Sequence, residues 1–194
     1  MNMVKRRDLG EVLAADENRD LALIYACALR WVLQKPEYEK QSEILCEAIL
    51  KDKDVFDANS AAIILQDISK PLYPGASGQF AALEKRRQYF VAELTIPLQG
   101  ITEAKTKTRR VPKTARQHMA LCLALEYCLG RMTYMPEVYQ SYVLCNAEYI
   151  PNAVKAKMLQ IIKDYKASGA SLGMSIDATA WLRFEAELKA QLGS

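Results

Sequence analysis

Two stretches of the chain are apolar on nearly every face of a predicted helix. Residues 21–33 contain a single charged side chain, that of Arg30, and residues 119–129 contain only that of Glu126. A helix that is apolar all round must be enclosed by neighbouring elements, because water on any side would meet apolar surface. We therefore predict that these two helices form the centre of the fold.

Shorter helices with one apolar face are expected around this centre. Ile44, Leu45, Ala48 and Ile49 lie on one face of residues 37–50, and apolar residues recur at i, i+3, i+4 and i+7 within 61–68, the pattern of two antiparallel amphipathic helices. Further helices are predicted at 77–94, 136–149 and 151–169, and from Ser175 towards the end of the chain. The expected fold is one all-α domain over residues 1–194, a compact bundle of about seven or eight helices.

Side chains that can cap helices mark several of the expected starts. Thr114 and Gln117 have capping-box spacing, in which each side chain accepts a hydrogen bond from the other residue's backbone N–H. The acidic and amide side chains of residues 16–18 predict the start of the first central helix, after a short opening turn at 9–15. Ser77 predicts the start of the helix that follows a proline and glycine break.

Positive charge is concentrated in one part of the chain. The sequence has 26 basic and 23 acidic residues, but no acid lies within residues 104–125. This part holds Lys105, Lys107, Arg109, Arg110, Lys113 and Arg116. Residues 101–114 form a basic connecting segment without helical periodicity, in which cations alternate with threonines. This alternation predicts either an extended loop or a short basic β-arm near 95–112.

A dense run of cations without neighbouring acids is typical of a surface that binds anions. Lysine and arginine bind nucleic-acid phosphates through release of counterions, and arginine can contact two phosphate oxygens at once. The sequence therefore predicts a non-enzymatic helical protein that contacts DNA or RNA phosphates through residues 105–116, with little base specificity. A solvated loop, an acidic protein partner and a membrane surface are other interpretations of the same charges. The main alternative function is a helical adaptor or scaffold subunit of a multiprotein assembly without nucleic-acid contact.

Three tyrosines share one face of the helix predicted at 136–149. Tyr139, Tyr142 and Tyr149 occupy positions i, i+3 and i+10, and Asn146 lies on the same face. On an exposed face these rings could stack on unpaired bases or contact another protein. The more common arrangement places such tyrosines in a seam between helices, with the hydroxyl group at solvent.

No motif for nucleophilic, nucleotide-binding or zinc chemistry is present in the sequence. His118 is the only histidine, and its place at a helix start beside the basic segment favours a polar surface role. Asp52 and Asp54 could together hold Mg²⁺, but such acids more often lie on solvated helix ends. We therefore expect no enzymatic activity, no cofactor and no bound metal.

The five cysteines are typical of a reducing compartment. Four of them lie in strongly apolar helical stretches, where a free thiol packs as a small hydrophobic group, and no two have C-x-x-C spacing. Residues 1–8 lead into acidic residues rather than into the apolar run of a secretory signal. The longest apolar runs, at 21–29 and 119–125, fall far short of the roughly 20 residues that span a bilayer. We expect a cytoplasmic protein without membrane contact.

Overall fold

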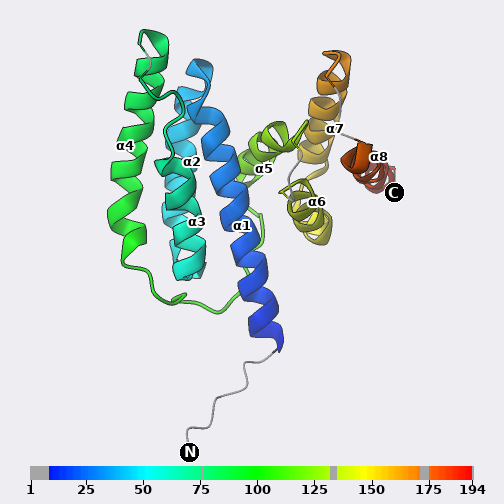
Figure 1. The fold of residues 1–194 in the computed structure, drawn as a ribbon. Coiled ribbons are helices and arrows are strands. Elements are labelled where there is room, and N and C mark those ends of the chain that lie inside the picture. Colours follow the sequence, from blue (N-terminus) through cyan, green and yellow to red (C-terminus); the bar gives the residue numbers. More distant parts are fainter. Residues whose placement is uncertain (1–8, 76, 132–134, 171–174, 194) are drawn as a thin grey trace, which may run out of the picture.

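The computed structural model describes residues 9–75, 77–131, 135–170 and 175–193, and this part of the chain is helical with no β-strand (Figure 1). The eight α-helices are α1 (Leu9–Leu33), α2 (Glu39–Asp52), α3 (Ala58–Ser69), α4 (Gln79–Gln99), α5 (Ala115–Cys128), α6 (Met135–Cys145), α7 (Asn152–Ala167) and α8 (Ser175–Leu192). Three single-turn 3₁₀ helices are η1 (Pro36–Tyr38), η2 (Lys53–Val55) and η3 (Ala147–Tyr149). The predicted all-α class is confirmed.

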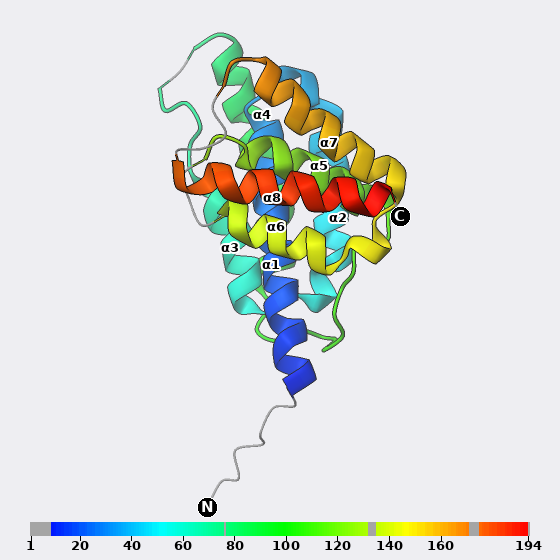
Figure 2. The same ribbon diagram turned by 90° about the vertical axis from the view of Figure 1, so that its right-hand side faces the viewer.

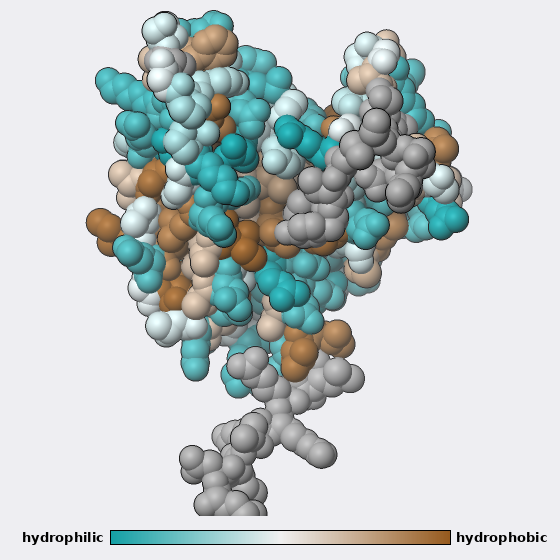
Figure 3. Space-filling model, in the orientation of Figure 1, coloured by the Kyte–Doolittle hydropathy of each residue, from teal (hydrophilic) through white to brown (hydrophobic). Residues whose placement is uncertain are grey.

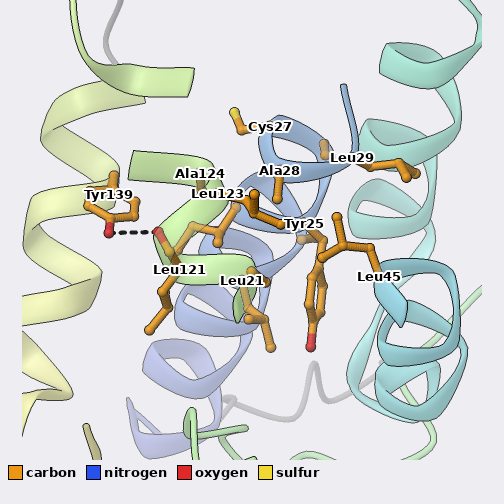
Figure 4. Close-up of a cluster of buried hydrophobic side chains, with 14 of the residues drawn as sticks. Leu21, Tyr25, Cys27, Ala28, Leu29, Leu45, Leu121, Leu123, Ala124 and Tyr139 are labelled. Atoms are coloured by element: carbon orange, nitrogen blue, oxygen red, sulfur yellow. Dashed lines mark hydrogen bonds between the residues drawn. The ribbon is translucent and has the colours of Figure 1, made fainter. Parts of the chain in front are cut away.

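The two predicted central helices lie at the middle of the structure. Figure 1 shows α2, α3 and α4 on one side of α1 and the helices α6, α7 and α8 on the other, with α5 between the two groups. Leu21 and Leu29 of α1 are at most 1 % exposed (Figure 4). Ile24 of α1 and Leu125 of α5 are completely buried. One cluster of buried side chains includes residues from all eight α-helices. The apolar periodicity therefore predicted the core correctly.

Aromatic side chains join α6 to the last helix. Figure 2 shows α8 on the outside of the bundle, where it packs on α6 and α7. Trp181 and Phe184 of α8 lie with ring centroids 5.7 Å apart, and the Phe184 ring lies 6.0 Å from that of Tyr139 on α6. The Tyr139 hydroxyl donates a hydrogen bond of 2.8 Å to the backbone oxygen of Leu121 on α5 (Figure 4). Edge-to-face rings stabilise this packing beyond their apolar area, and the hydroxyl is satisfied without water.

Two helix starts differ from the sequence prediction. The first central helix begins at Leu9, so residues 16–18 lie inside α1 and do not cap it. Residues 9–15 are mostly good helix formers without proline, and they extend the helix towards the N-terminus. The N-cap of α4 is Gly78, with φ of 64°, rather than Ser77. A positive φ is readily adopted only by glycine, so the chain turns into the helix one residue later.

Other helix boundaries match the prediction more closely. The capping box of Thr114 and Gln117 is formed at the start of α5. The helix predicted over 136–149 ends at Cys145, and the last turn of the predicted range forms the separate 3₁₀ helix η3. The break occurs because the side-chain amide of Asn146 donates a hydrogen bond to the backbone carbonyl of Tyr142. Residues 1–8, used for the secretory-signal expectation, lie outside the described residues, and so does the side chain of Ser175.

Candidate functional site

The basic segment runs along one end of the helical bundle. Residues 101–114, called the connector from here on, join the end of α4 to the start of α5 without forming a strand (Figure 1). The predicted extended loop is therefore present, and the alternative β-arm over 95–112 is absent. The Thr106 N–H donates to the backbone oxygen of Asp54 at 3.1 Å, so the connector is attached to the chain after α2.

Asn18 of α1 holds the backbone of the connector. Its side-chain Nδ2 donates to the Thr108 backbone oxygen at 3.1 Å, and its Oδ1 accepts from the Arg110 N–H at 2.8 Å. The side chain is only 3 % exposed, so these bonds form away from bulk water. A single amide thus replaces the two backbone partners that a neighbouring strand would have supplied. From the sequence, Asn18 was predicted to cap a helix. The sequence feature that indicates its actual role is a polar residue one turn before Leu21, in line with the buried face of α1.

Arg110 pairs with two carboxylates at the end of α2. Its Nε lies 3.2 Å from Asp52 Oδ1, and its Nη2 lies 2.9 Å from Asp54 Oδ1. Asp52 is 6 % exposed and also accepts hydrogen bonds from the Tyr25 hydroxyl and, at 2.9 Å, from Gln117 Nε2. Burial first and the Asp52 charge second raise the pKa of Tyr25, so the phenol stays protonated as a donor. Arg110 thus pairs with both of the carboxylates that the sequence offered as a possible Mg²⁺ pair.

Three further cations of the predicted phosphate-binding set also face acids of the same chain. Arg109 pairs with Glu17 of α1 and donates to the Asn146 side chain. The Lys107 ammonium lies 3.1 Å from a Glu11 carboxylate oxygen, and Arg116 lies 2.7 Å from one of Glu47. The Lys107 and Arg116 pairs are solvent-exposed, so each stabilises the fold by only about 0 to 1 kcal/mol. Taken together, the pairs nevertheless neutralise much of the charge that suggested an anion site.

The remaining two cations are exposed. Lys105 and Lys113 have no acidic partner within the part of the chain that the structure describes. The Lys113 ammonium lies 5.1 Å from the ring centroid of Tyr149, and the Arg109 guanidinium carbon lies 6.0 Å from the same centroid. The Tyr149 ring therefore contacts cations of its own chain through its electron-rich face.

The three tyrosines do not form a shared exposed face. Tyr139 is completely buried and Tyr142 is 2 % exposed, with its hydroxyl donating to the Arg110 backbone oxygen at 3.3 Å. Burial raises the pKa of Tyr142. Only Tyr149 is partly accessible. Tyr139 and Tyr142 therefore pack between helices in the core and are not available for base stacking, because α8 and the connector cover this face of α6.

A cavity of about 430 Å³ lies between the connector, α1 and the start of α3. Its described lining includes the carboxylates of Glu11, Asp57 and Glu103 and the ammonium group of Lys107. Asp57 accepts the Ser60 N–H at 2.8 Å and so caps α3. An excess of carboxylates disfavours an anionic ligand such as phosphate. Across the described ranges, no three His, Cys, Asp or Glu side chains cluster in a way that could hold a metal ion.

His118 and two buried cysteines have surroundings that do not favour nucleophilic chemistry. His118 Nε2 lies 2.6 Å from the Pro112 backbone oxygen and fixes the end of the connector. Cys46 and Cys122 are buried, and burial raises the pKa of each thiol to about 11. A thiol of that pKa is almost fully protonated near neutral pH and is a poor nucleophile.

The outward side of α4 is a second candidate surface. One side of this helix exposes Ala82, Lys85, Tyr89, Ala92, Glu93 and Ile96, together called the α4 outer face. Ile96 is 85 % exposed and Tyr89 is 58 % exposed. Figure 3 shows brown, hydrophobic surface among teal and white residues on the side of the molecule where α4 lies. This face was not predicted from the sequence, because the prediction for this helix used only its buried apolar stripe.

None of the described helices has the length and apolar character needed to cross a membrane. No protein-family model, no curated protein and no solved structure matches this chain.

Proposed function

We propose that this protein is a non-enzymatic helical adaptor or scaffold subunit that binds a protein chain and makes no functional contact with nucleic acid. The observation that carries the proposal is the α4 outer face, on which Ile96 and Tyr89 expose apolar surface along one helical line. Large apolar side chains aligned on one face of an outer helix are typical of contact surfaces between proteins.

The structure of the connector supports the nucleic-acid hypothesis less than the sequence of the connector does. A cation that already faces a carboxylate must give up that partner before it can neutralise a phosphate. This condition applies to Lys107, Arg109, Arg110 and Arg116. Only Lys105 and Lys113 could contact phosphates without breaking an ion pair. Two phosphate contacts correspond to a shallow dependence of affinity on salt, with a slope of about −2 in log affinity against log salt.

A titration with labelled duplex and single-stranded nucleic acid separates the two functions. We expect no saturable binding at about 50 mM salt, where phosphate contacts are strongest. The matched variant replaces Lys105 and Lys113 with glutamine, since these two side chains leave no acid unpaired when they are removed. Binding that weakens with added salt and on this double substitution would contradict the proposal and restore the nucleic-acid hypothesis.

Partner capture tests the protein-binding side of the proposal. The Ile96→Lys variant places a charge in the α4 outer face, and the control variant Leu182→Lys makes the same kind of change at an exposed leucine of α8, which is 54 % exposed. After nuclease treatment of the source extract, we expect the wild type and the control to retain the same proteins and the Ile96 variant to lose them. Equal retention by all three would remove α4 as the contact surface.

A further inference from the structure

The α4 outer face repeats with a spacing of seven residues. Ala82, Tyr89 and Ile96 are spaced seven residues apart. Each step of seven residues turns by only about 20° around the helix axis, so the three side chains point in nearly the same direction. Lys85 and Glu93 lie four residues before and four residues after Tyr89, about 40° to either side of its line. The face is therefore an apolar seam with one cation and one anion placed symmetrically about its central residue.

We propose that the α4 outer face binds a second copy of this chain, with the two α4 helices antiparallel about a two-fold axis at Tyr89. This inference rests on the proposed function, in which α4 is the contact surface, and it names the partner.

Two-fold symmetry makes the face complementary to itself. Residues equally distant from the axis meet across an antiparallel pair, so Lys85 of each copy lies opposite Glu93 of the other. The same symmetry sets the small Ala82 opposite the large Ile96, and the two Tyr89 rings meet at the centre. A parallel pair would instead put Lys85 beside Lys85 and Glu93 beside Glu93, which is repulsive. The charge pattern thus selects the antiparallel arrangement.

Both charged groups are free for this contact. Lys85 and Glu93 are exposed, and neither has an ion-pair partner in the described ranges of the chain. The residues three and four positions away from each, on either side, are all uncharged. Exchanging these charges therefore leaves every ion pair within α4 unchanged, and any effect on association comes from the contact between copies.

The predicted dimer is weak. A contact made by one helix from each copy buries less than the roughly 1,200 Å² of total surface typical of stable complexes. We therefore expect monomers at low concentration and a growing dimer fraction between about 10 and about 500 µM, the behaviour of small transient interfaces.

Sedimentation velocity over that concentration range tests the proposal on the full chain. Ile96→Lys is expected to abolish the concentration-dependent rise in sedimentation coefficient, and Leu182→Lys is expected to retain it. Lys85→Glu and Glu93→Lys each create two like-charge contacts, so each is expected to lower the association constant by about 5- to 30-fold. The double variant restores both opposite-charge contacts and is expected to associate within about threefold of the wild type. Circular dichroism confirms that every variant keeps its helix content.

The outcomes separate this inference from the function on which it rests. A wild type that stays monomeric throughout overturns self-association, and so does a double charge variant that associates no better than either single one. If the protein is monomeric but Ile96→Lys still loses a captured protein, the proposed function stands with a different partner. If nucleic acid binds through Lys105 and Lys113, the proposed function itself is wrong.

Discussion

Asn18→Ala is the substitution that most directly tests how the connector is held. The change removes two hydrogen bonds to the connector backbone, one given to Thr108 and one accepted from Arg110. Neutral hydrogen bonds contribute about 0.5 to 1.5 kcal/mol each, so their loss costs about 1 to 3 kcal/mol. Alanine regains about 0.5 kcal/mol of helix propensity inside α1. The expected net loss in the free energy of unfolding is about 0.5 to 2.5 kcal/mol.

Urea unfolding measures this loss. With a slope of about 2.5 kcal/mol per molar urea, the midpoint is expected to fall by about 0.2 to 1 M. Asn59→Ala is the control, because Asn59 is an exposed asparagine near the start of α3 with no side-chain hydrogen bond given by the described structure. An exposed substitution of this kind changes stability by about 0.5 kcal/mol or less.

Trypsin provides a second readout that global stability alone would not produce. Arg109 and Arg110 lie in the connector and become cleavable when its backbone detaches from α1. We expect Asn18→Ala to be cut at these residues faster than the wild type under native conditions, while sites in the core helices stay protected. If the Asn18 and Asn59 variants behave alike in both urea and trypsin, Asn18 does not hold the connector and our account of this site is wrong.

Three further measurements test the core and the ionisable groups. Leu123→Ala is expected to lower the free energy of unfolding by about 2 to 5 kcal/mol, measured by urea unfolding, because this side chain is 5 % exposed and packs in the core. Of the five thiols, only Cys145 is exposed, so a thiol reagent is expected to modify one cysteine in the native protein and five after denaturation. Burial alone would raise the pKa of Glu84, but hydrogen bonds from the N–H groups of 72–73 and from Arg87 outweigh it and lower the pKa below 4.5. Because its folded-state pKa is lowered, the Glu84 carboxylate stabilises the protein at pH values above the pKa of the unfolded chain, and this stabilisation is lost as the pH falls. Glu84→Gln is therefore expected to reduce the free energy of unfolding at neutral pH. Below about pH 4.5 the variant is expected to lose less stability than the wild type.

The apolar pattern predicted the centre of the fold because enclosure follows from composition along a helix. A stretch such as 21–33 has no polar face to turn towards water, so its burial depends on local sequence alone. The ends of helices were less predictable. Whether α1 begins at Leu9 or near Asn18 depends on what covers that turn, and the connector that covers it lies about ninety residues later in the sequence.

The tyrosines of α6 illustrate the limit of periodicity for a site. The spacing of Tyr139 and Tyr142 placed them correctly on one side of a helix. It carried no information about which other element covers that side, and Trp181 and Phe184 of α8 cover Tyr139. A shared face is a local property, whereas its exposure depends on contacts between residues far apart in the sequence.

The cations of the connector show the same limit for charge. No acid lies within residues 104–125, yet Arg110 meets Asp52 and Asp54, and Arg109 meets Glu17. Few side chains of this segment are apolar, with Pro112 buried and Ile101 packed against the core, so hydrogen bonds and charge supply much of what holds it to the bundle. The cations that suggested a phosphate partner are thus the groups that attach this segment to the helices. For the same reason, Arg109→Ala with Arg110→Ala would leave acids unpaired and detach the connector, and a loss of nucleic-acid binding in that variant would not identify a phosphate contact. Substitution of Lys105 and Lys113, which hold no acid, tests phosphate binding without breaking an ion pair.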